Sequence, residues 1–160
     1  MGYMLLPAVV LALILGLTSI ARDQAKSVIP SSGGAQLENA GETFISYRNA
    51  VMAYQRANPS FTGSVPASVL AETGAQFSQA FLQTAGNSIT AFGTSGRVVT
   101  AYVSLPTGAI SAATAMTEND ASLGLATGAN WKSFAPGASD QPLAVVVPNG
   151  ALVSITQTGN

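Results

Sequence analysis

Few residues in this chain are of the types that carry out acid–base, nucleophilic or metal chemistry. The 160 residues include no histidine and no cysteine. The commonest general base near neutral pH, the Ser-His and Cys-His nucleophile pairs, and the usual imidazole and thiolate metal ligands are therefore all absent. Any catalysis would have to depend on carboxylates, hydroxyls or lysines.

The seven carboxylates form only two close pairs along the sequence. Glu38 and Glu42 would lie one turn apart on a helix, where the ordinary interpretation is a solvated polar face. Glu118-Asn119-Asp120 could contribute to a hard-cation site, but the spaced ligands and central glycine of a calcium loop are missing. The sequence therefore predicts no metal site.

Other motifs that carry chemistry are also missing. The glycines match neither the phosphate-binding loop GxxxxGK[ST] nor the dinucleotide fingerprint GxGxxG, and Lys132 is not part of a Ser-x-x-Lys motif. Trp131 with Lys132 and Phe134 could make a small binding face, although one tryptophan in a domain of this size is more often a core residue. We predict no catalytic residue, no cofactor and no enzymatic activity.

The composition limits the partners that this protein can have. Charged residues make up 8% of the chain, against roughly 25% in typical soluble proteins. Six Lys and Arg face seven Asp and Glu, so there is no basic stripe of the kind that phosphate backbones require. Nucleic acid is not an expected partner, and the length allows a single domain of ordinary size.

Residues 1–21 are predicted to be a transmembrane anchor. The 18 residues from Tyr3 to Ile20 carry no charge, and as a helix they would be about 27 Å long, close to the thickness of a hydrocarbon core. A cleaved signal peptide is the alternative, because Ser19-Ile20-Ala21 has the small-x-small form of a cleavage site, but a basic n-region is missing. The anchor residues are Tyr3, Leu5, Leu6, Val9, Leu11, Ile14, Leu17 and Ile20.

The orientation of this anchor is set by two signals that conflict. Arg22 and Lys26 follow the apolar run and nothing basic precedes it, so the positive-inside rule places the following domain in the cytoplasm. The composition, without Cys and with many Ser, Thr, Gly and Asn, is more typical of an exported domain. Our prediction is a single-pass protein whose domain is exported.

A long amphipathic helix is predicted after the anchor. Residues 22–36 form a juxtamembrane segment and linker, in which SVIPSSGGAQ indicates a break. From about residue 37 to 57 the apolar residues recur at helical spacing, and Asn58-Pro59 ends the pattern. The stripe that we expect to pack on a sheet is Leu37, Phe44, Tyr47, Val51 and Tyr54.

The remaining sequence predicts short helices and antiparallel strands. Residues 89–92 and 97–105 flank the turn GTSG as a first hairpin, and residues 143–147 and 151–156 flank Pro148-Asn149-Gly150 as a second. A strand is expected at 122–127 and short helices at 66–74 and 109–118. Residues 37–160 are therefore predicted to be one α+β domain, in which the amphipathic helix packs on a small antiparallel sheet.

Three stretches resemble a known family. "FISYRNAVMAYQRANPSFTGSVP", "GRVVTAYVSLPTGA" and "DASLGLATGANW" are similar to the PilM family of conjugative-plasmid and type IVb thin-pilus systems, which is distinct from the actin-like ATPase of the same name. The resemblance implies a non-enzymatic protein of the bacterial inner membrane, and the exported domain that the composition predicts would then lie in the periplasm. It would belong to the pilus assembly or pilin-transport apparatus, and its partners would be the membrane and other assembly proteins or pilins.

Two other functions remain open from the sequence. The layout of an apolar N-terminus, an amphipathic helix and a small antiparallel domain is also that of pilins, so a minor pilin or a pilus-tip binding module is the first alternative. However, no Lys or Arg precedes Gly2, and Pro7 occupies the place of the usual pilin glutamate. A secreted enzyme is the second and less favoured alternative, because the usual catalytic bases are missing. The sequence does not specify an oligomeric state.

Overall fold

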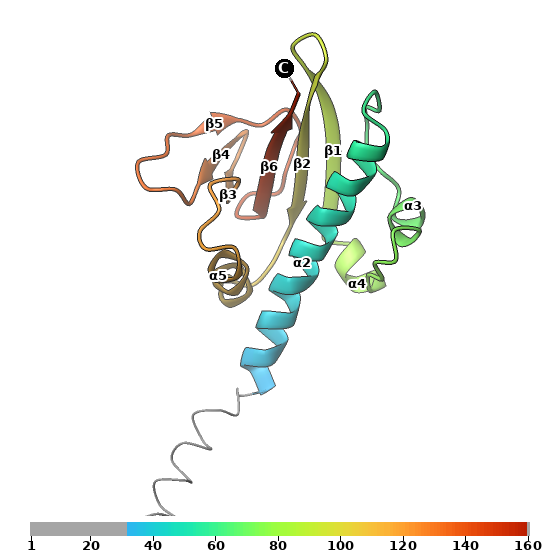
Figure 1. Ribbon diagram of the computed structural model, residues 1–160. Coiled ribbons are helices and arrows are strands. Elements are labelled where there is room, and N and C mark those ends of the chain that lie inside the picture. The colour runs from blue at the N-terminus through green and yellow to red at the C-terminus, as the bar shows by residue number, and fades with distance from the viewer. Residues whose placement is uncertain (1–31, 160) are drawn as a thin grey trace, which may run out of the picture. The chain divides into compact units, whose positions relative to one another are not determined.

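The computed structural model describes residues 32–159, which contain four helices and six strands (Figure 1). Residues from Gln36 onward belong to one compact unit. The helices are α2 (Ser32–Ala57), α3 (Ala67–Ala71), α4 (Gln79–Leu82) and α5 (Thr107–Met116). The strands are β1 (Ala85–Phe92), β2 (Gly96–Val103), β3 (Leu123–Thr127), β4 (Asn130–Ser133), β5 (Gln141–Pro142) and β6 (Leu152–Thr158).

All six strands form one sheet in the order β1-β2-β6-β3-β4-β5, and every neighbouring pair is antiparallel. The last strand in the sequence, β6, lies in the interior of this sheet. It pairs with β2 from Arg97–Thr158 to Val103–Leu152, and with β3 on its other side. Helices combined with an antiparallel sheet confirm the predicted α+β class.

Helix α2 ends as its sequence predicts but begins earlier. After Ala57, the Asn58 backbone N–H and side-chain amide both donate to the carbonyl of Tyr54, at 2.9 and 3.0 Å, which closes the last turn. The helix starts at Ser32, so residues 32–36 are helical and the predicted break is wrong there. Extending an existing helix costs less than nucleating one, and this outweighs the low helix propensity of the two glycines.

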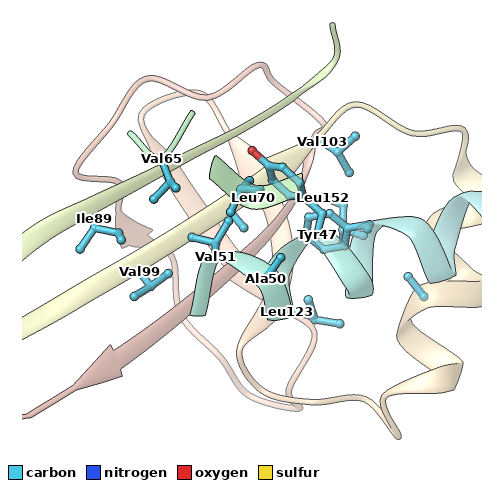
Figure 2. Close-up of a cluster of buried hydrophobic side chains, with 13 residues drawn as sticks. Tyr47, Ala50, Val51, Val65, Leu70, Ile89, Val99, Val103, Leu123 and Leu152 are labelled. Carbon is cyan, nitrogen blue, oxygen red and sulfur yellow. The ribbon is translucent and has the colours of Figure 1, made fainter. Parts of the chain in front are cut away.

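The main core lies between α2 and one face of the sheet (Figure 2). Phe44, Tyr47, Ala50 and Val51 of α2 are buried there, and full burial of each large apolar side chain is worth roughly 1.5–3 kcal/mol. Val65, Leu70 and Ala113 close the sides of this core. The strand residues that complete it are Ile89, Val99, Ala101, Val103, Leu123 and Leu152.

The opposite face of the sheet is covered in part by residues 143–151. Ala126, Val147, Ala151 and Val153 form a second buried cluster, and Leu143 and Val145 are among the residues packed against it. The prediction that residues 143–147 form a hairpin with 151–156 is wrong, because β6 pairs with β2 and β3 instead. Two long ladders of non-local backbone hydrogen bonds thus override a local hairpin signal.

Both edges of the sheet are protected. On the β1 side, Gly63 and Ile89 exchange two backbone hydrogen bonds of 2.8 Å. Next to this bridge, the side chain of Asn87 accepts a hydrogen bond from the Val65 N–H and donates one to the Val65 carbonyl. The other edge, β5, has only two residues, and one is Pro142, which has no N–H to offer.

Helix α5 packs closely against the N-terminal half of α2. A Cβ atom added at Gly41 would lie 2.9 Å from the Ala113 nitrogen and 3.0 Å from the Ala109 oxygen, so the two backbones approach each other at a glycine. One turn earlier, Leu37 lies against Gly108, where an added Cβ would be 2.6 Å from Leu37 Cδ1. The first part of α2 therefore contacts a helix and not the sheet.

Candidate interaction surface

The predicted anchor residues Tyr3, Leu5, Leu6, Val9, Leu11, Ile14, Leu17 and Ile20 lie outside the described residues. Among residues 32–159, no helix combines the length and the apolar character needed to cross a membrane. The anchor and the orientation of the chain therefore stay predictions.

The predicted packing stripe occupies three environments. Phe44, Tyr47 and Val51 are buried in the main core. Tyr54 is partly buried at its margin, where its ring meets Phe61 edge to face at a centroid distance of 5.2 Å. Leu37 lies against α5 at Gly108. Spacing identified the stripe, but it did not specify which element each residue would meet.

The two carboxylate pairs do not build a metal site. Glu38 and Glu42 are exposed on α2. Asp120 forms an ion pair with Arg48 at 3.1 Å and accepts a hydrogen bond from the Ser122 N–H at 2.9 Å. No group of three His, Cys, Asp or Glu residues that could hold a metal ion occurs between residues 32 and 159.

The electrostatics of Asp120 reflect these contacts. Burial alone would raise the pKa of Asp120, but the hydrogen bonds from Ser122 and the contact with Arg48 outweigh it and lower the pKa below its usual range. The residue is ionised at neutral pH and ties the loop before β3 to α2. Glu118 and Asn119, which precede it, both have positive φ, at 51° and 60°. The loop is therefore shaped for this structural contact.

A buried polar network joins α2 to β1. The Asn87 side-chain nitrogen donates to the Tyr47 hydroxyl at 2.7 Å and to the Val65 carbonyl at 3.0 Å, and its oxygen accepts from the Val65 N–H at 2.7 Å. Burial raises the pKa of Tyr47 above its ordinary value, although the hydrogen bond from Asn87 opposes the change and nearby Tyr102 adds to it. This tyrosine is a structural hydroxyl with no pKa suited to proton transfer near neutrality.

The three residues suggested as a small binding face are not brought together. Trp131 is buried on the face of the sheet opposite α2, in register with Ala126. Phe134 packs at the margin of the main core, which is on the α2 side. Lys132 is exposed. Gly124 makes the position of the tryptophan possible, because an added Cβ would lie 2.7 Å from Trp131 Cε3.

A concave surface lies on this opposite face, and we call it the sheet-face groove. Its cavity volume is about 330 Å³, near the lower end of the usual range for ligand pockets. None of the residues that line it is charged. The apolar lining is Phe92, Val98, Trp131, Pro142, Ala144 and Ile155, and the polar lining is Thr100, Gln141 and Gln157.

A second groove adjoins the first at Ala144, which lines both. It follows residues 143–147 and has a volume of about 410 Å³, again with no charged lining residue. Val146 projects here with 96% of its surface exposed, and Phe92 of the first groove is 43% exposed. Large exposed apolar side chains next to uncharged grooves are typical of surfaces that receive a partner.

No pattern in the sequence predicts the sheet-face groove. Its lining comes from β1, β2, β4, β5, β6 and the segment after β5, and only the sheet order brings them together. Alternation within β2 would have placed Val98 and Thr100 on one face. The alternation does not indicate that α2 covers the opposite face of the sheet and leaves the face of Val98 and Thr100 open.

The comparisons with known proteins bear on the fold and on the family of the chain. No curated protein is matched at a significant level. A solved structure of a protein named PilM from Escherichia coli B7A superposes with a TM-score of 0.56 over 81% of this chain and 98% of that one, at 14% identity, which supports the fold alone. A pilM protein from Pseudomonas aeruginosa 2192 is 20% identical over 76% of this chain and 95% of that one, with a TM-score of 0.35. The PilM family model matches residues 10–155, most of the sequence, and the chain therefore belongs to the PilM family.

Proposed function

We propose that this protein is a non-enzymatic, membrane-anchored component of a type IV thin-pilus or conjugative-pilus assembly or pilin-transport apparatus. The anchor would lie in the bacterial inner membrane, and residues 37–160 would form a periplasmic domain. Membership of the PilM family supports a role in pilus biogenesis. The partners would be pilins or other assembly proteins.

One observation carries the proposal of a retained anchor. The family match begins at residue 10, inside the uncharged run from Tyr3 to Ile20, and continues to residue 155 within β6. The second half of the apolar run is thus part of what the family shares with the domain. This continuity favours an anchor that stays attached over a signal peptide that is removed.

The side chains of the described domain support a role in assembly. Arg48 is paired with Asp120, and the Arg97 guanidinium donates to the carbonyls of Ser60, Phe61 and Gly96. These charges hold segments of the fold together. The grooves on the open face of the sheet offer apolar and amide groups, which are the chemistry of protein recognition.

Protease protection in spheroplasts tests the topology, and the mass of the full-length product tests anchor retention. We expect residues 32–160 to be digested in intact spheroplasts, while the product keeps Met1 or Gly2. Protection until lysis would place the domain in the cytoplasm, as Arg22 and Lys26 indicate under the positive-inside rule. A mature chain beginning at Arg22 would contradict the retained anchor.

Pilus assembly itself is tested by deletion and complementation. Loss of the protein should abolish surface pili while pilin subunits still accumulate in the inner membrane. Normal piliation in the deletion strain would refute a role in assembly. The arrangement of α2 along an antiparallel sheet also favours the minor-pilin alternative, and detection of the protein in sheared pili, not in the membrane fraction, would support that alternative.

A further inference from the structure

The two faces of the sheet differ in how completely they are covered. Helix α2 and the shorter helices bury one face around Phe44 and Val51. On the other face, residues 143–151 cover the cluster around Val153. The sheet-face groove lies on the same face, and its lining includes Val98 and Ile155 of neighbouring strands.

A threonine hydroxyl lies in this groove. Thr100 lines it and is only 1% exposed, in register with Ile155 of β6. Within residues 32–159 its hydroxyl forms no hydrogen bond. Among the described residues the Ser154 hydroxyl is the fully buried side-chain atom without a partner, so the Thr100 hydroxyl is reached by solvent from the groove. A polar atom of a bound ligand can replace water as its hydrogen-bond partner.

Two free amides flank the same groove. Gln141 of β5 and Gln157 of β6 are exposed and line it, and neither side chain has a hydrogen-bond partner in the described part of the chain. A glutamine amide offers one acceptor and two donors, which match the C=O and N–H of a peptide bond. Amides beside an apolar groove therefore suit a polypeptide backbone.

The absence of charged residues in the lining limits which groups can bind in the groove. A charged group placed against Phe92, Val98 and Trp131 would lose its hydration without gaining an ionic partner, which is costly. The occupant should therefore be uncharged in the part that enters. A volume of about 330 Å³ at the low end of ligand pockets indicates one or two inserted side chains and not a large cofactor.

The geometry also disfavours addition of a strand at the edge of the sheet. Edge pairing is blocked by the Gly63 bridge at Ile89 and by Pro142 in the two-residue strand β5. Recognition should therefore take place on the face of the sheet.

We propose that the sheet-face groove binds an uncharged, extended segment of another polypeptide. Its inserted side chain lies between Phe92 and Trp131 and offers a polar atom to Thr100, and its backbone bonds to Gln141 and Gln157. This deepens the proposed function by naming the surface that receives a partner. Binding is measured by a test that does not depend on membrane topology, so the two can fail separately.

Trp131 makes the groove observable, because it is the single tryptophan in the sequence. The experiment uses the full-length protein in phosphatidylcholine vesicles and follows the emission of Trp131. The first probe is a pool of blocked hexapeptides made from Ala, Val, Leu, Pro, Thr and Gln. The second is the same pool with one Asp or Lys at each position. We expect a saturable change with the first pool and at least about tenfold weaker binding with the second.

Three variants locate the binding. Thr100→Val keeps the shape of the side chain and should weaken binding about tenfold, the loss expected from one buried hydrogen bond. Phe92→Gln should weaken it, whereas Met116→Gln should not; Phe92 and Met116 are both 43% exposed, so they lose similar apolar surface. Unchanged emission with both pools, equal binding of the charged pool, or equal effects of the Phe92 and Met116 variants would overturn the proposal.

Photo-crosslinking in piliated cells tests the occupant. A benzoylphenylalanine at position 157 should form an adduct that maps to an uncharged stretch of another polypeptide. An adduct between two copies of this chain would overturn the proposed occupant in favour of self-association. An adduct to a charged stretch, or none at position 157, would overturn the uncharged-peptide mode of recognition.

Discussion

The side chain of Asn87 joins three parts of the fold, and Asn87→Ala should strongly destabilise it. This asparagine satisfies the Val65 N–H, the Val65 carbonyl and the Tyr47 hydroxyl, at 2.7, 3.0 and 2.7 Å. Val65 and Tyr47 are both buried, so none of the three groups can turn to bulk water. The substitution removes every one of these bonds at once.

The expected magnitude follows from the number of orphaned groups. Each buried polar group left unpaired costs roughly 1–3 kcal/mol, and a water molecule entering the space of the lost amide would restore part of the bonding. We therefore expect Asn87→Ala to lower the free energy of unfolding by about 3–6 kcal/mol. Since small domains are stable by about 5–15 kcal/mol, this is a large share of the total.

The loss of unfolding free energy is measured by urea unfolding of a fragment of residues 32–160, with Trp131 emission as the signal. Tyr47→Phe is the second substitution of a double-mutant cycle, because it removes only the hydroxyl that Asn87 contacts. On the Asn87→Ala background, Tyr47→Phe should cost less than it does in the unmodified fragment, because the bond is already gone. A loss below about 1 kcal/mol for Asn87→Ala, or strictly additive effects of the two substitutions, would refute this reasoning.

Three further predictions concern close packing, charge and a buried hydroxyl. Gly41→Ala should lower the free energy of unfolding by about 1–3 kcal/mol, because its Cβ would meet the α5 backbone. Gly33→Ala is the control and should not lower it, because Gly33 has open space around it. Equal effects of the two substitutions in urea unfolding would contradict the close approach of the helices. Because the pKa of Asp120 is lowered, its contribution to stability is present above pH about 4 and is lost as pH falls through the folded-state pKa. Asp120→Asn should flatten this acid dependence, by less than about 1 kcal/mol given the partial exposure of the pair with Arg48, and an unchanged pH profile would argue against it. Ser154→Ala should raise the free energy of unfolding by about 1 kcal/mol, since the Ser154 hydroxyl is buried without a partner, and thermal unfolding at lower temperature than the parent would contradict this.

The parts of the fold that depend on local pattern could be predicted from the sequence. The spacing of Phe44, Tyr47 and Val51 specifies a buried helical stripe, and the hairpin around Gly93 follows from β-branched residues on both sides of a glycine-rich turn. The segment 143–147 was mistaken for a strand for the same reason, because Asn149-Gly150 is a strong local turn signal. Strand β6 pairs instead with β2 and β3, which come from distant parts of the sequence.

The candidate site could not be predicted, because it depends on which face of the sheet stays open. The proximity of Trp131 and Phe134 in the sequence predicts a shared face. They lie on opposite faces, since Trp131 is in register with Ala126 while Phe134 packs in the α2 core. The free hydroxyl of Thr100 has no sequence signature at all, because any threonine in a strand has the same local pattern.

The position of β6 has a consequence during synthesis of the protein. Residues 152–158 are the last strand to leave the ribosome, yet they lie between β2 and β3 and connect the two halves of the sheet. The β1–β2 hairpin and the β3–β4–β5 group therefore have no strand to join them until translation has passed residue 158. The six-stranded sheet is therefore completed only when the chain is almost fully synthesised. A chain terminated 20 residues early would yield two unpaired half-sheets, open to degradation, and no smaller version of the domain.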